Sequence, residues 1–287
     1  MKHEWEAVAD SLMVGAYDLH VHTLPSAFPR AQDGFEVIQE ADQVGMAGIM
    51  LKSHYEPTAL RAALINRHSG CKTKAYGGLA LNWPTGGLNV HAVENAVKVG
   101  AKIIWMPTRD AANSLRFGNM DGDFFNRKGI SLLNEDGTLD HRVYEIMDVV
   151  KASGATLATG HISPEESILL CREGRKRGVR MILTHPEFPR TILPPQTQKE
   201  LADLGVLIEK NWLNVASGSV TASQMANTIR LVGSERTYIA TDRGQKGCPP
   251  PVSEYRRFIL ALLEEGLSEK ELRDLTHTVP ASIVEGT

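Results

Sequence analysis

The stretch Asp18-Leu19-His20-Val21-His22-Thr23 decides the prediction of the fold. The residues around it are apolar, which predicts a buried strand. Because side chains alternate along a strand, His20 and His22 point to the same side. Two imidazoles on one face at the end of a strand can bind one cation from two sides. A single His-x-His is more often a pair of hydrogen-bonded polar residues, so the prediction also depends on the later strand ends.

Length and charge set the class of protein. The chain has 287 residues, 42% of them hydrophobic, and a formal net charge of −3. This length suits a single (β/α) barrel. Without a basic stripe or an acidic tail, neither nucleic acid nor a membrane surface is expected as a partner.

Cysteine usage and the first residues of the chain point to a cytoplasmic protein. Cys71, Cys171 and Cys248 lie far apart, without the spacing of a zinc knuckle, and their odd number argues against a disulfide framework. A reducing compartment fits best. Residues 1–15 lack the apolar segment of a signal peptide, and no apolar run is long enough to span a bilayer.

Short apolar runs alternate along the chain with segments of helical periodicity. The predicted strands are residues 17–22, 47–52, 74–82, 102–106, 155–160, 180–184, 206–210 and 237–241. Each is followed by a predicted helix, at 34–44, 58–67, 90–99, 140–152, 165–177, 196–204, 223–232 and 253–265, with residues 268–275 closing the chain.

Eight such units predict a parallel sheet closed into a (β/α)8 TIM barrel, with residues 1–287 as one domain. An open doubly wound sheet is the alternative, but no Gly-rich phosphate turn follows the first strand. A long polar insertion, residues 110–139, follows strand four. Insertions of this length are usually lids or binding loops.

Potential metal ligands gather at the carboxyl ends of the predicted strands, where the active sites of such barrels lie. They are His20, His22, Lys52, His54, His161, His185 and Asp242. A closed barrel brings these ends toward one centre. Three or four histidines with one carboxylate match a hydrolytic zinc-type centre that keeps an open position for water.

The same residues give the sequence a resemblance to the amidohydrolase superfamily of metal-dependent hydrolases, over nearly the whole chain. The motifs that carry it are Asp18-Leu19-His20-Val21-His22, Ala158-Thr159-Gly160-His161, Leu183-Thr184-His185-Pro186, Ile239-Ala240-Thr241-Asp242 and the closing Thr276-His277-Thr278-Val279-Pro280-Ala281, in which Val279 stands where the family has Asn.

The resemblance implies that His20, His22, His161 and His185 are metal ligands and that Asp242 is both ligand and general base. It further implies hydrolysis of a C–N bond (amide or cyclic amide) or a related ester in a small molecule, through a metal-activated water. The metal expected is zinc, as one or two ions, although imidazole and carboxylate also suit Mn, Fe or Ni.

One departure from the family pattern concerns the group that bridges two metals. The end of strand four reads Trp105-Met106-Pro107-Thr108, without the Lys or Glu found there in many members. Lys52 is a substitute, either carboxylated as a bridge or acting as a cation toward the substrate. His54 is predicted to bind a metal or the substrate's oxyanion.

Several neighbouring side chains are assigned to the substrate or to the surroundings of the site. Asn82 is predicted to line the pocket wall, and Arg109 to bind a substrate carboxylate or phosphate. Glu187 is predicted to orient a ligand histidine, and Glu209 and Lys210 to pair with each other.

Other functions are compatible with the same pattern. The His-x-His-Thr start also resembles the polymerase-and-histidinol-phosphatase phosphoesterases, but Asp242-Arg243-Gly244 lacks the Asp-x-His of that family. An amidohydrolase-related decarboxylase and a non-catalytic barrel that binds a small molecule are the remaining alternatives. A small-molecule substrate is the expected partner, and a homo-oligomer is compatible with the sequence.

Overall fold

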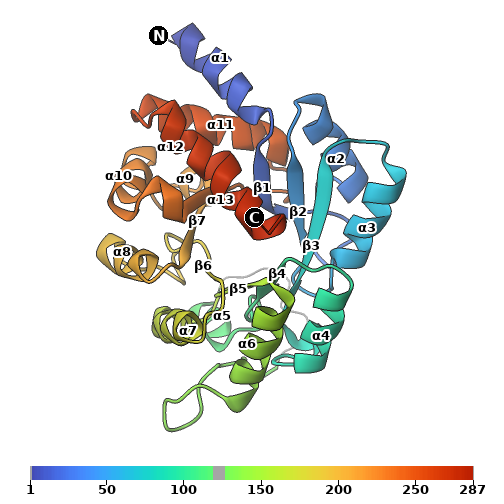
Figure 1. The fold of residues 1–287 in the computed structure, drawn as a ribbon, viewed down its shortest axis with the longest axis vertical. Helices are drawn as coiled ribbons and strands as arrows, with labels where there is room; N and C mark the ends of the chain where they lie inside the picture. The colour runs from blue at the N-terminus through green and yellow to red at the C-terminus, as the bar shows by residue number, and fades with distance from the viewer. Residues whose placement is uncertain (1, 119–126, 287) are drawn as a thin grey trace.

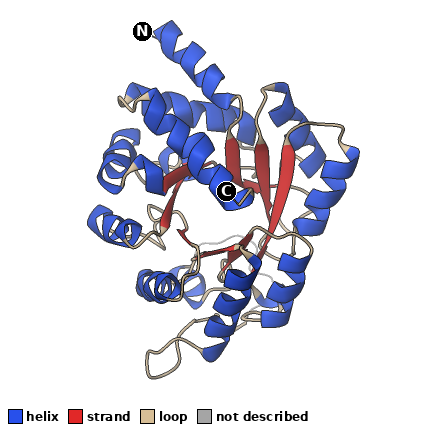
Figure 2. Cartoon of the chain, viewed as in Figure 1, coloured by secondary structure: helices blue, strands red, loops and turns tan. Residues whose placement is uncertain are grey.

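The computed structural model describes residues 2–118 and 127–286. Eight parallel strands pair in their sequence order, β1 to β8. They are β1 (Tyr17–His22), β2 (Gly48–Lys52), β3 (Lys74–Ala80), β4 (Ile103–Trp105), β5 (Thr156–Ala158), β6 (Met181–Leu183), β7 (Leu207–Asn211) and β8 (Thr237–Ala240). Figure 2 shows these strands curving around one centre with helices outside them. The predicted single (β/α)8 barrel is confirmed.

Helices cover the outside of the barrel in the same order (Figure 1). They are α2 (Gly34–Gln43), α3 (Ala59–His68), α4 (Val90–Lys98), α6 (His141–Ser153), α7 (Pro164–Lys176), α8 (Pro195–Asp203), α10 (Ala222–Val232) and α11 (Pro251–Glu264). Several begin at a capping box, in which two side chains satisfy the first free backbone N–H groups. Asp33, Ser163 and Thr221 are the cap residues of α2, α7 and α10.

The predicted strands are longer than the observed ones at β4, β5 and β6. β4, β5 and β6 have three residues each, whereas the sequence pattern covers five or six. The residues after these strands stay buried but leave the ladder, because they bend inward to carry site residues such as His161 and His185. The apolar pattern of the sequence predicts burial, and at the site the buried residues continue past the ends of the strands.

Some elements have no counterpart in the sequence prediction. They are α1 (Lys2–Met13), α5 (Ala112–Phe117), α9 (Trp212–Ala216), α13 (Val279–Val284) and two 3-10 turns (Trp83–Thr85 and Ser234–Arg236), whereas the predicted closing segment 268–275 is observed as α12 (Glu269–Arg273) and the start of a π-helical turn (Asp274–Thr278). Most are one or two turns long, too short for helical periodicity to stand out.

The seam between β1 and the end of β8 closes the barrel. The Asp242 N–H donates to the His20 carbonyl at 2.9 Å, and the His22 N–H donates to the Arg243 carbonyl at 2.8 Å. Below this pair, the buried Asp18 carboxylate accepts hydrogen bonds from the Thr241 N–H and hydroxyl at 3.0 and 2.5 Å. Closure therefore places the residues of the first and last motifs side by side.

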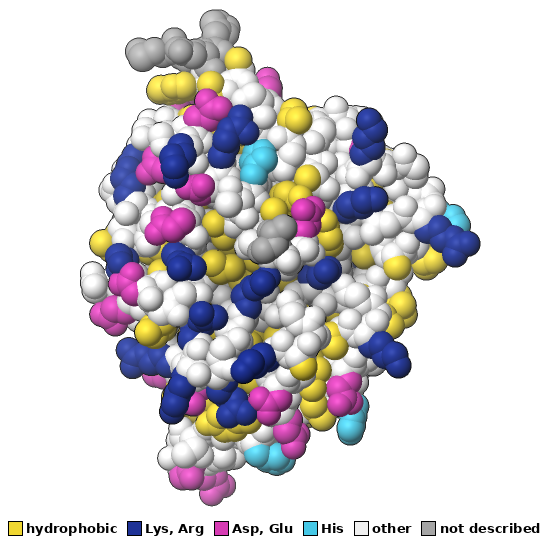
Figure 3. Space-filling model, in the orientation of Figure 1, with side chains coloured by type: hydrophobic (Ala, Val, Ile, Leu, Met, Phe, Trp, Pro, Cys, Tyr) yellow, Lys and Arg dark blue, Asp and Glu magenta, His cyan; other side chains and the backbone are white. Residues whose placement is uncertain are grey.

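Helix α13 covers the amino-terminal end of the barrel. Val279, Ile283 and Val284 pack with Tyr17 and Leu207, which begin β1 and β7. Figure 3 shows this face, with many Lys and Arg side chains toward the region of α7 and α8 and carboxylates among them. The opposite, carboxyl-terminal end carries the predicted ligands. Within residues 2–118 and 127–286, no helix has both the length and the apolar character needed to cross a bilayer.

The predicted insertion after β4 is partly described, since its residues 119–126 lie outside the described ranges. Its described parts pack onto the barrel. Ile130 and Leu132 are buried, and the Leu132 N–H donates to Glu166 on α7. The Asn113 side chain donates to the carbonyls of His161 and Arg190 at 3.2 and 2.7 Å. The insertion thus fixes the loops after β5 and β6.

Gly244 allows the seam to close, which gives a test of its importance. Its φ is +117°, and an added Cβ would lie 1.7 Å from the His22 carbonyl oxygen. We expect Gly244→Ala to lower the free energy of unfolding by about 2–4 kcal/mol, measured in urea. The control Gly247→Ala also has a positive φ, +84°, but open space around its Cβ, and should lose only about 1–2 kcal/mol. Equal losses in the two variants would contradict the role given to the seam.

Candidate metal centre

Five imidazoles meet at the carboxyl-terminal end of the barrel. Successive ring centroids lie 4.9–6.0 Å apart and close into a circle in the order His20, His22, His54, His161, His185 and back to His20. The first two lie in β1, and the other three lie two or three residues after the ends of β2, β5 and β6. The structure thus brings together histidines separated by up to 165 positions.

The tightest group consists of His20, His22 and Asp242, whose ligand atoms all lie within 4.8 Å of one another. The Asp242 Oδ1 lies 3.1 Å from Nε2 of His20 and 3.1 Å from Nε2 of His22. His161 and His185 border this group through their ring contacts. The Asp242 side chain is 13% exposed, compared with 1% and 3% for the two histidines, so the carboxylate forms the accessible side of the group.

Hydrogen bonding on the far side of each ring fixes the nitrogens that face Asp242. The His20 Nδ1–H donates to Glu209 Oε1 at 2.6 Å, and the His22 Nδ1–H donates to the Lys52 carbonyl at 3.0 Å. Both Nε2 atoms then present lone pairs to a carboxylate oxygen. Three acceptors that converge in this way favour positive charge among them, which the Lys52 ammonium, 2.8 Å from the His20 Nε2, or a bound metal ion supplies.

Burial keeps most of these imidazoles neutral, the state that metal ligation needs. It lowers the pKa of His22 to about 3 and that of His185 to about 4, and it holds the pKa of His161 well below its usual value. His20 differs. Burial opposes its charged form, but Asp242 and Glu209 outweigh burial and raise its pKa, so a metal ion competes with a proton at this ring.

Two buried imidazole nitrogens have no hydrogen-bond partner among the described residues, namely Nδ1 of His161 and Nε2 of His185. The His185 Nδ1 contacts the Thr191 hydroxyl, which donates to the His185 carbonyl and so accepts from the ring. The free Nε2 of His185 is therefore a lone pair. Unpaired buried nitrogens beside converging acceptors fit a bound cation, and the residues present thus suit the metal that the family resemblance implies.

Lys52 reaches into the same group. Its side chain is buried, and its Nζ lies 2.8 Å from the His20 Nε2 and 5.2 Å from the ring centroid of Trp105 on β4. Burial lowers the pKa of Lys52 to about 8, against the opposing pull of Asp242 and Glu209. The lysine from β2 thus lies beside Trp105 of β4, the strand whose end lacks a Lys or Glu in this sequence.

Glu209 lies beside His20 at the centre of the site, whereas the sequence predicts that it pairs with Lys210. It bonds His20 and also accepts from the Tyr238 hydroxyl at 2.6 Å. Lys210 points to the opposite side of β7 and pairs with Glu187. The predicted Glu209–Lys210 pair is wrong, because neighbours in a strand face opposite sides. Glu187 binds Lys210 and Gln198 instead of a ligand histidine.

Asn82 lies beneath the site, fully buried. Its amide donates to the His54 carbonyl and to the Thr108 hydroxyl, each at 2.6 Å, and its oxygen accepts from the Thr108 and Asp110 N–H groups. The Thr108 hydroxyl in turn lies 2.9 Å from the His54 Nδ1. These bonds hold His54 and the loop after β4 in place. The predicted contact of Asn82 with substrate stays a prediction, and its observed bonds favour a positioning role.

Arg109 is half-buried beside His54. Its guanidinium carbon lies 3.9 Å from the centroid of the Phe28 ring, and the edge of that ring meets His54 at 5.7 Å between centroids. Arg109 therefore lies beside His54, and its predicted contact with a substrate carboxylate or phosphate stays a prediction.

The backbone at the site is strained in two places. Among the described residues, the non-glycine residues with positive φ are His185 (+31°) and Asp242 (+53°). Such conformations are uncommon outside glycine and cluster where function requires a particular side chain. Their coincidence with two predicted ligands supports a functional role for this end of the barrel.

The sequence analysis gave Glu209 the wrong partner and did not identify three further residues that the structure places around the centre: Tyr238, Arg30 and Arg190. Glu209 and Tyr238 carried one signal, because an acidic residue and a tyrosine inside otherwise apolar strands must find partners. Arg30 and Arg190 lie in loops after β1 and β6, where no periodicity applies. They are 8% and 7% exposed.

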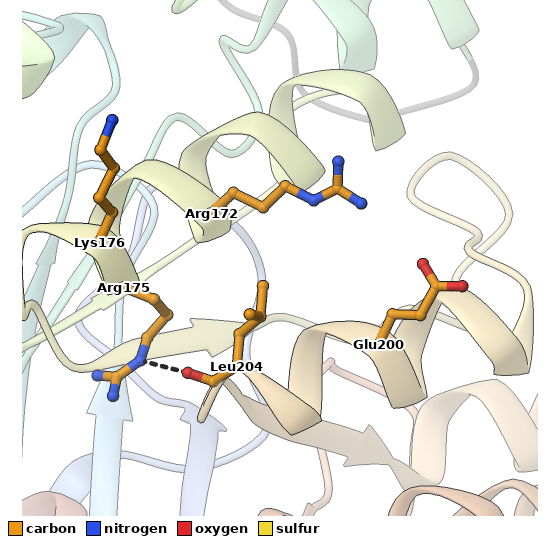
Figure 4. A pocket seen from close by; sticks show the side chains of 5 residues that line it. All are labelled: Arg172, Arg175, Lys176, Glu200 and Leu204. Atoms are coloured by element: carbon orange, nitrogen blue, oxygen red, sulfur yellow. Dashed lines mark hydrogen bonds between the residues drawn. The ribbon is translucent and has the colours of Figure 1, made fainter.

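The described side chains also line hollows on the outer surface of the barrel. One of these, between α7 and α8, is lined by Arg172, Arg175, Lys176, Glu200 and Leu204. Figure 4 shows its side chains, with the Arg175 Nε donating to the Leu204 carbonyl at 2.9 Å. The lining lacks the histidines that define the metal group.

Comparison with solved structures shows the same fold. An amidohydrolase from Pseudomonas aeruginosa aligns with a TM-score of 0.65 at 14% identity, covering 99% of this chain and 98% of that one. The probable dipeptidase PvdM from Pseudomonas aeruginosa gives 0.65 at 12% identity, covering 95% and 96%. The phosphotriesterase homology protein from Escherichia coli, complexed with phosphate in its active site, gives 0.56 at 13% identity, covering 94% and 98%.

The fold is thus the TIM barrel of amidohydrolase-type proteins, which confirms the resemblance seen in the sequence at the level of the fold. The chain itself belongs to a family of unknown function (DUF6282), whose model matches residues 15–209. A search of curated proteins finds no significant match.

Glu209 should control metal affinity through His20. We expect Glu209→Gln to weaken Zn²⁺ binding about 10–100-fold, measured by titration with a competing chelator, because the carboxylate fixes the tautomer and basicity of the ring. The control Glu254→Gln changes an equally buried carboxylate that pairs with Arg243, and it should leave metal affinity unchanged. Unchanged affinity in Glu209→Gln would refute the assignment.

Proposed function

We propose that the protein is a metal-dependent hydrolase that cleaves a C–N bond, amide or cyclic amide, or a related ester in a small molecule. The observation that carries this proposal is the convergence of the Nε2 atoms of His20 and His22 on the Asp242 carboxylate. Structures of the same fold with hydrolase names support the class.

The metal would be held by His20, His22 and Asp242, with His161 and His185 as further ligands through their unpaired nitrogens. Zinc is the proposed metal, and manganese, iron or nickel suit the same donor set. When bound, such a metal lowers the pKa of its water toward about 7 and polarises the substrate's carbonyl. No other cofactor is proposed.

Asp242 is the proposed general base. Its carboxylate is the most accessible group of the cluster, and the neighbouring imidazoles His20 and His22 outweigh burial and hold its pKa well below the usual value. Ionised, it accepts the proton of the attacking water and then delivers that proton to the leaving nitrogen. His54, at the rim of the cluster, would stabilise the oxyanion on the substrate, whereas the free Nε2 lone pair of His185 suits the metal.

Lys52 is proposed as a metal ligand after carboxylation. Its buried amine, with a pKa of about 8, is neutral in a larger fraction than an exposed lysine. The neutral amine attacks carbon dioxide, forming an N–C bond and releasing one proton to solvent. The product replaces a cation next to His20 with an anionic oxygen ligand, which removes the repulsion between an ammonium and a metal ion.

The state of Lys52 is tested by ¹³C NMR in ¹³C-bicarbonate with zinc present. We expect a carbamate resonance in the wild type that Lys52→Met lacks. Lys210→Met changes another fully buried lysine, paired with Glu187 outside the cluster, and should keep the signal. Absence of the resonance from the wild type, or its survival in Lys52→Met, would assign Lys52 to the other predicted role, a cation facing the substrate.

Phosphoester hydrolysis is the second candidate, favoured by the arginines at the mouth. The reaction class is decided by assaying amide, lactone and phosphoester substrates with the same zinc-loaded protein. Turnover of phosphoesters alone would replace C–N hydrolysis as the function.

Loss of Asp242 should abolish turnover. We expect Asp242→Asn to lower kcat/KM by about 10²–10⁴-fold on whichever substrate class is hydrolysed, because the amide cannot accept the water proton. Most zinc should stay bound, since the histidines remain, as elemental analysis would show. Asp148→Asn, on the outer helix α6, is the control and should behave as the wild type. Undiminished turnover in Asp242→Asn would exclude the general-base assignment.

A further inference from the structure

Two arginines are buried at the mouth of the barrel without a carboxylate partner among the described residues. Arg30 and Arg190 are more than nine-tenths buried, yet neither forms an ion pair there. Nε of Arg30 and both Nε and Nη1 of Arg190 lack any hydrogen-bond partner within residues 2–118 and 127–286. A buried guanidinium without an anion is unfavourable, so such groups call for a ligand that supplies one.

Aromatic rings hold these guanidiniums over the metal group from two sides. On one side, Phe28 carries Arg30 and Arg109, whose guanidinium carbons lie 5.7 and 3.9 Å from its centroid. On the other, Phe188 carries Arg190 at 5.0 Å. Contact with a ring face leaves N–H groups of Arg30 and Arg190, those that lack a hydrogen-bond partner among the described residues, available to an anion.

Each aromatic ring also touches the imidazole circle. Phe28 meets His54 at 5.7 Å between centroids, and Phe188 meets His161 at 5.8 Å and His185 at 5.1 Å. Each arginine thus contacts an aromatic ring that in turn contacts a histidine of the site. The Arg190 loop is fixed independently, because its carbonyl accepts from the Asn113 side chain of the insertion.

The electrostatic influence of the arginines agrees with this geometry. Arg30, Arg109 and Arg190 act on His22, His54 and His161 respectively, and each lowers the pKa of its histidine further after burial has done so. Arg109 also opposes the charged forms of Arg30 and Arg190, although for Arg30 the attraction of Asp242, with which it forms no ion pair, is the larger charge effect. Like charges held together in a buried site favour the arrival of an oxyanion.

We infer that the substrate is an anion, with a carboxylate or phosphate group bound by Arg30 and Arg190 beside the scissile bond. The inference deepens the proposed function, because it names the substrate class of that same site. Bidentate hydrogen bonds from guanidinium to oxyanion provide the recognition. Arg109 completes the positive rim on the Phe28 side.

Calorimetric titration tests this inference without any turnover. The full-length protein, as purified and after chelation of metal, is titrated at fixed ionic strength with inorganic phosphate, with glutarate and with the neutral glutaramide. Chelated protein shows binding that does not depend on a metal. We expect saturable binding of phosphate or glutarate, whichever matches the substrate's group, and none of glutaramide.

Variants assign the binding to the arginines. Arg30→Gln and Arg190→Gln should each weaken anion binding at least tenfold. Arg172→Gln, an exposed arginine in the outer hollow of Figure 4, should change it less than twofold. Without anion, Arg30→Gln and Arg190→Gln should unfold at a temperature no lower than the wild type, because a buried unpaired charge is removed.

If a glutamine variant does not fold, Arg30→Lys or Arg190→Lys replaces it, and loss of the bidentate fork should still weaken binding severalfold. The inference is overturned if the wild type binds neither anion saturably, or if the arginine variants bind as well as the wild type. A protein that binds anions through these arginines but hydrolyses nothing would overturn the proposed function alone.

Discussion

Closure of the barrel between β1 and the residues after β8 is the constraint on which the site depends. Two backbone hydrogen bonds join His20 and His22 to Asp242 and Arg243, and Asp18 fixes Thr241 beneath them. The same seam therefore completes the sheet and assembles the tightest group of ligand atoms. Folding and construction of the candidate metal centre are one event in this chain, because the ligands become neighbours only when the last strand meets the first.

Around this seam, the imidazoles of the site are held by specific hydrogen bonds. Glu209 and Tyr238 fix one side of His20, the Lys52 carbonyl fixes His22, and Asn82 holds the loop beside His54. Each of these bonds satisfies a buried donor or acceptor, and those to the two imidazoles leave Nε2 of His20 and of His22 facing Asp242. Such arrangements stabilise one orientation of a ligand at the expense of others, which is how a protein prepares a site before the ligand arrives.

The fold and the convergence of histidines could be predicted from the sequence because both follow simple rules. Apolar runs alternating with helical periodicity define the units, and parallel strands in a barrel present their carboxyl ends together. Partners of individual polar residues could not be predicted. Glu209 and Lys210 are neighbours in a strand and face opposite sides, but which of the two faces the centre depends on the register of β7. Arg30 and Arg190 sit in loops whose path is set by tertiary contacts, to Gly244 and Gln245 for one and to Asn113 for the other.

The left-handed backbone at His185 and Asp242 has a consequence for engineering. Glycine would adopt both conformations more easily than the residues present, so replacing either side chain relieves backbone strain. A laboratory selection that rewards heat resistance alone would drift toward glycine at these two positions, and would yield hardier barrels stripped of their polar centre. Libraries built on this scaffold should hold both positions constant.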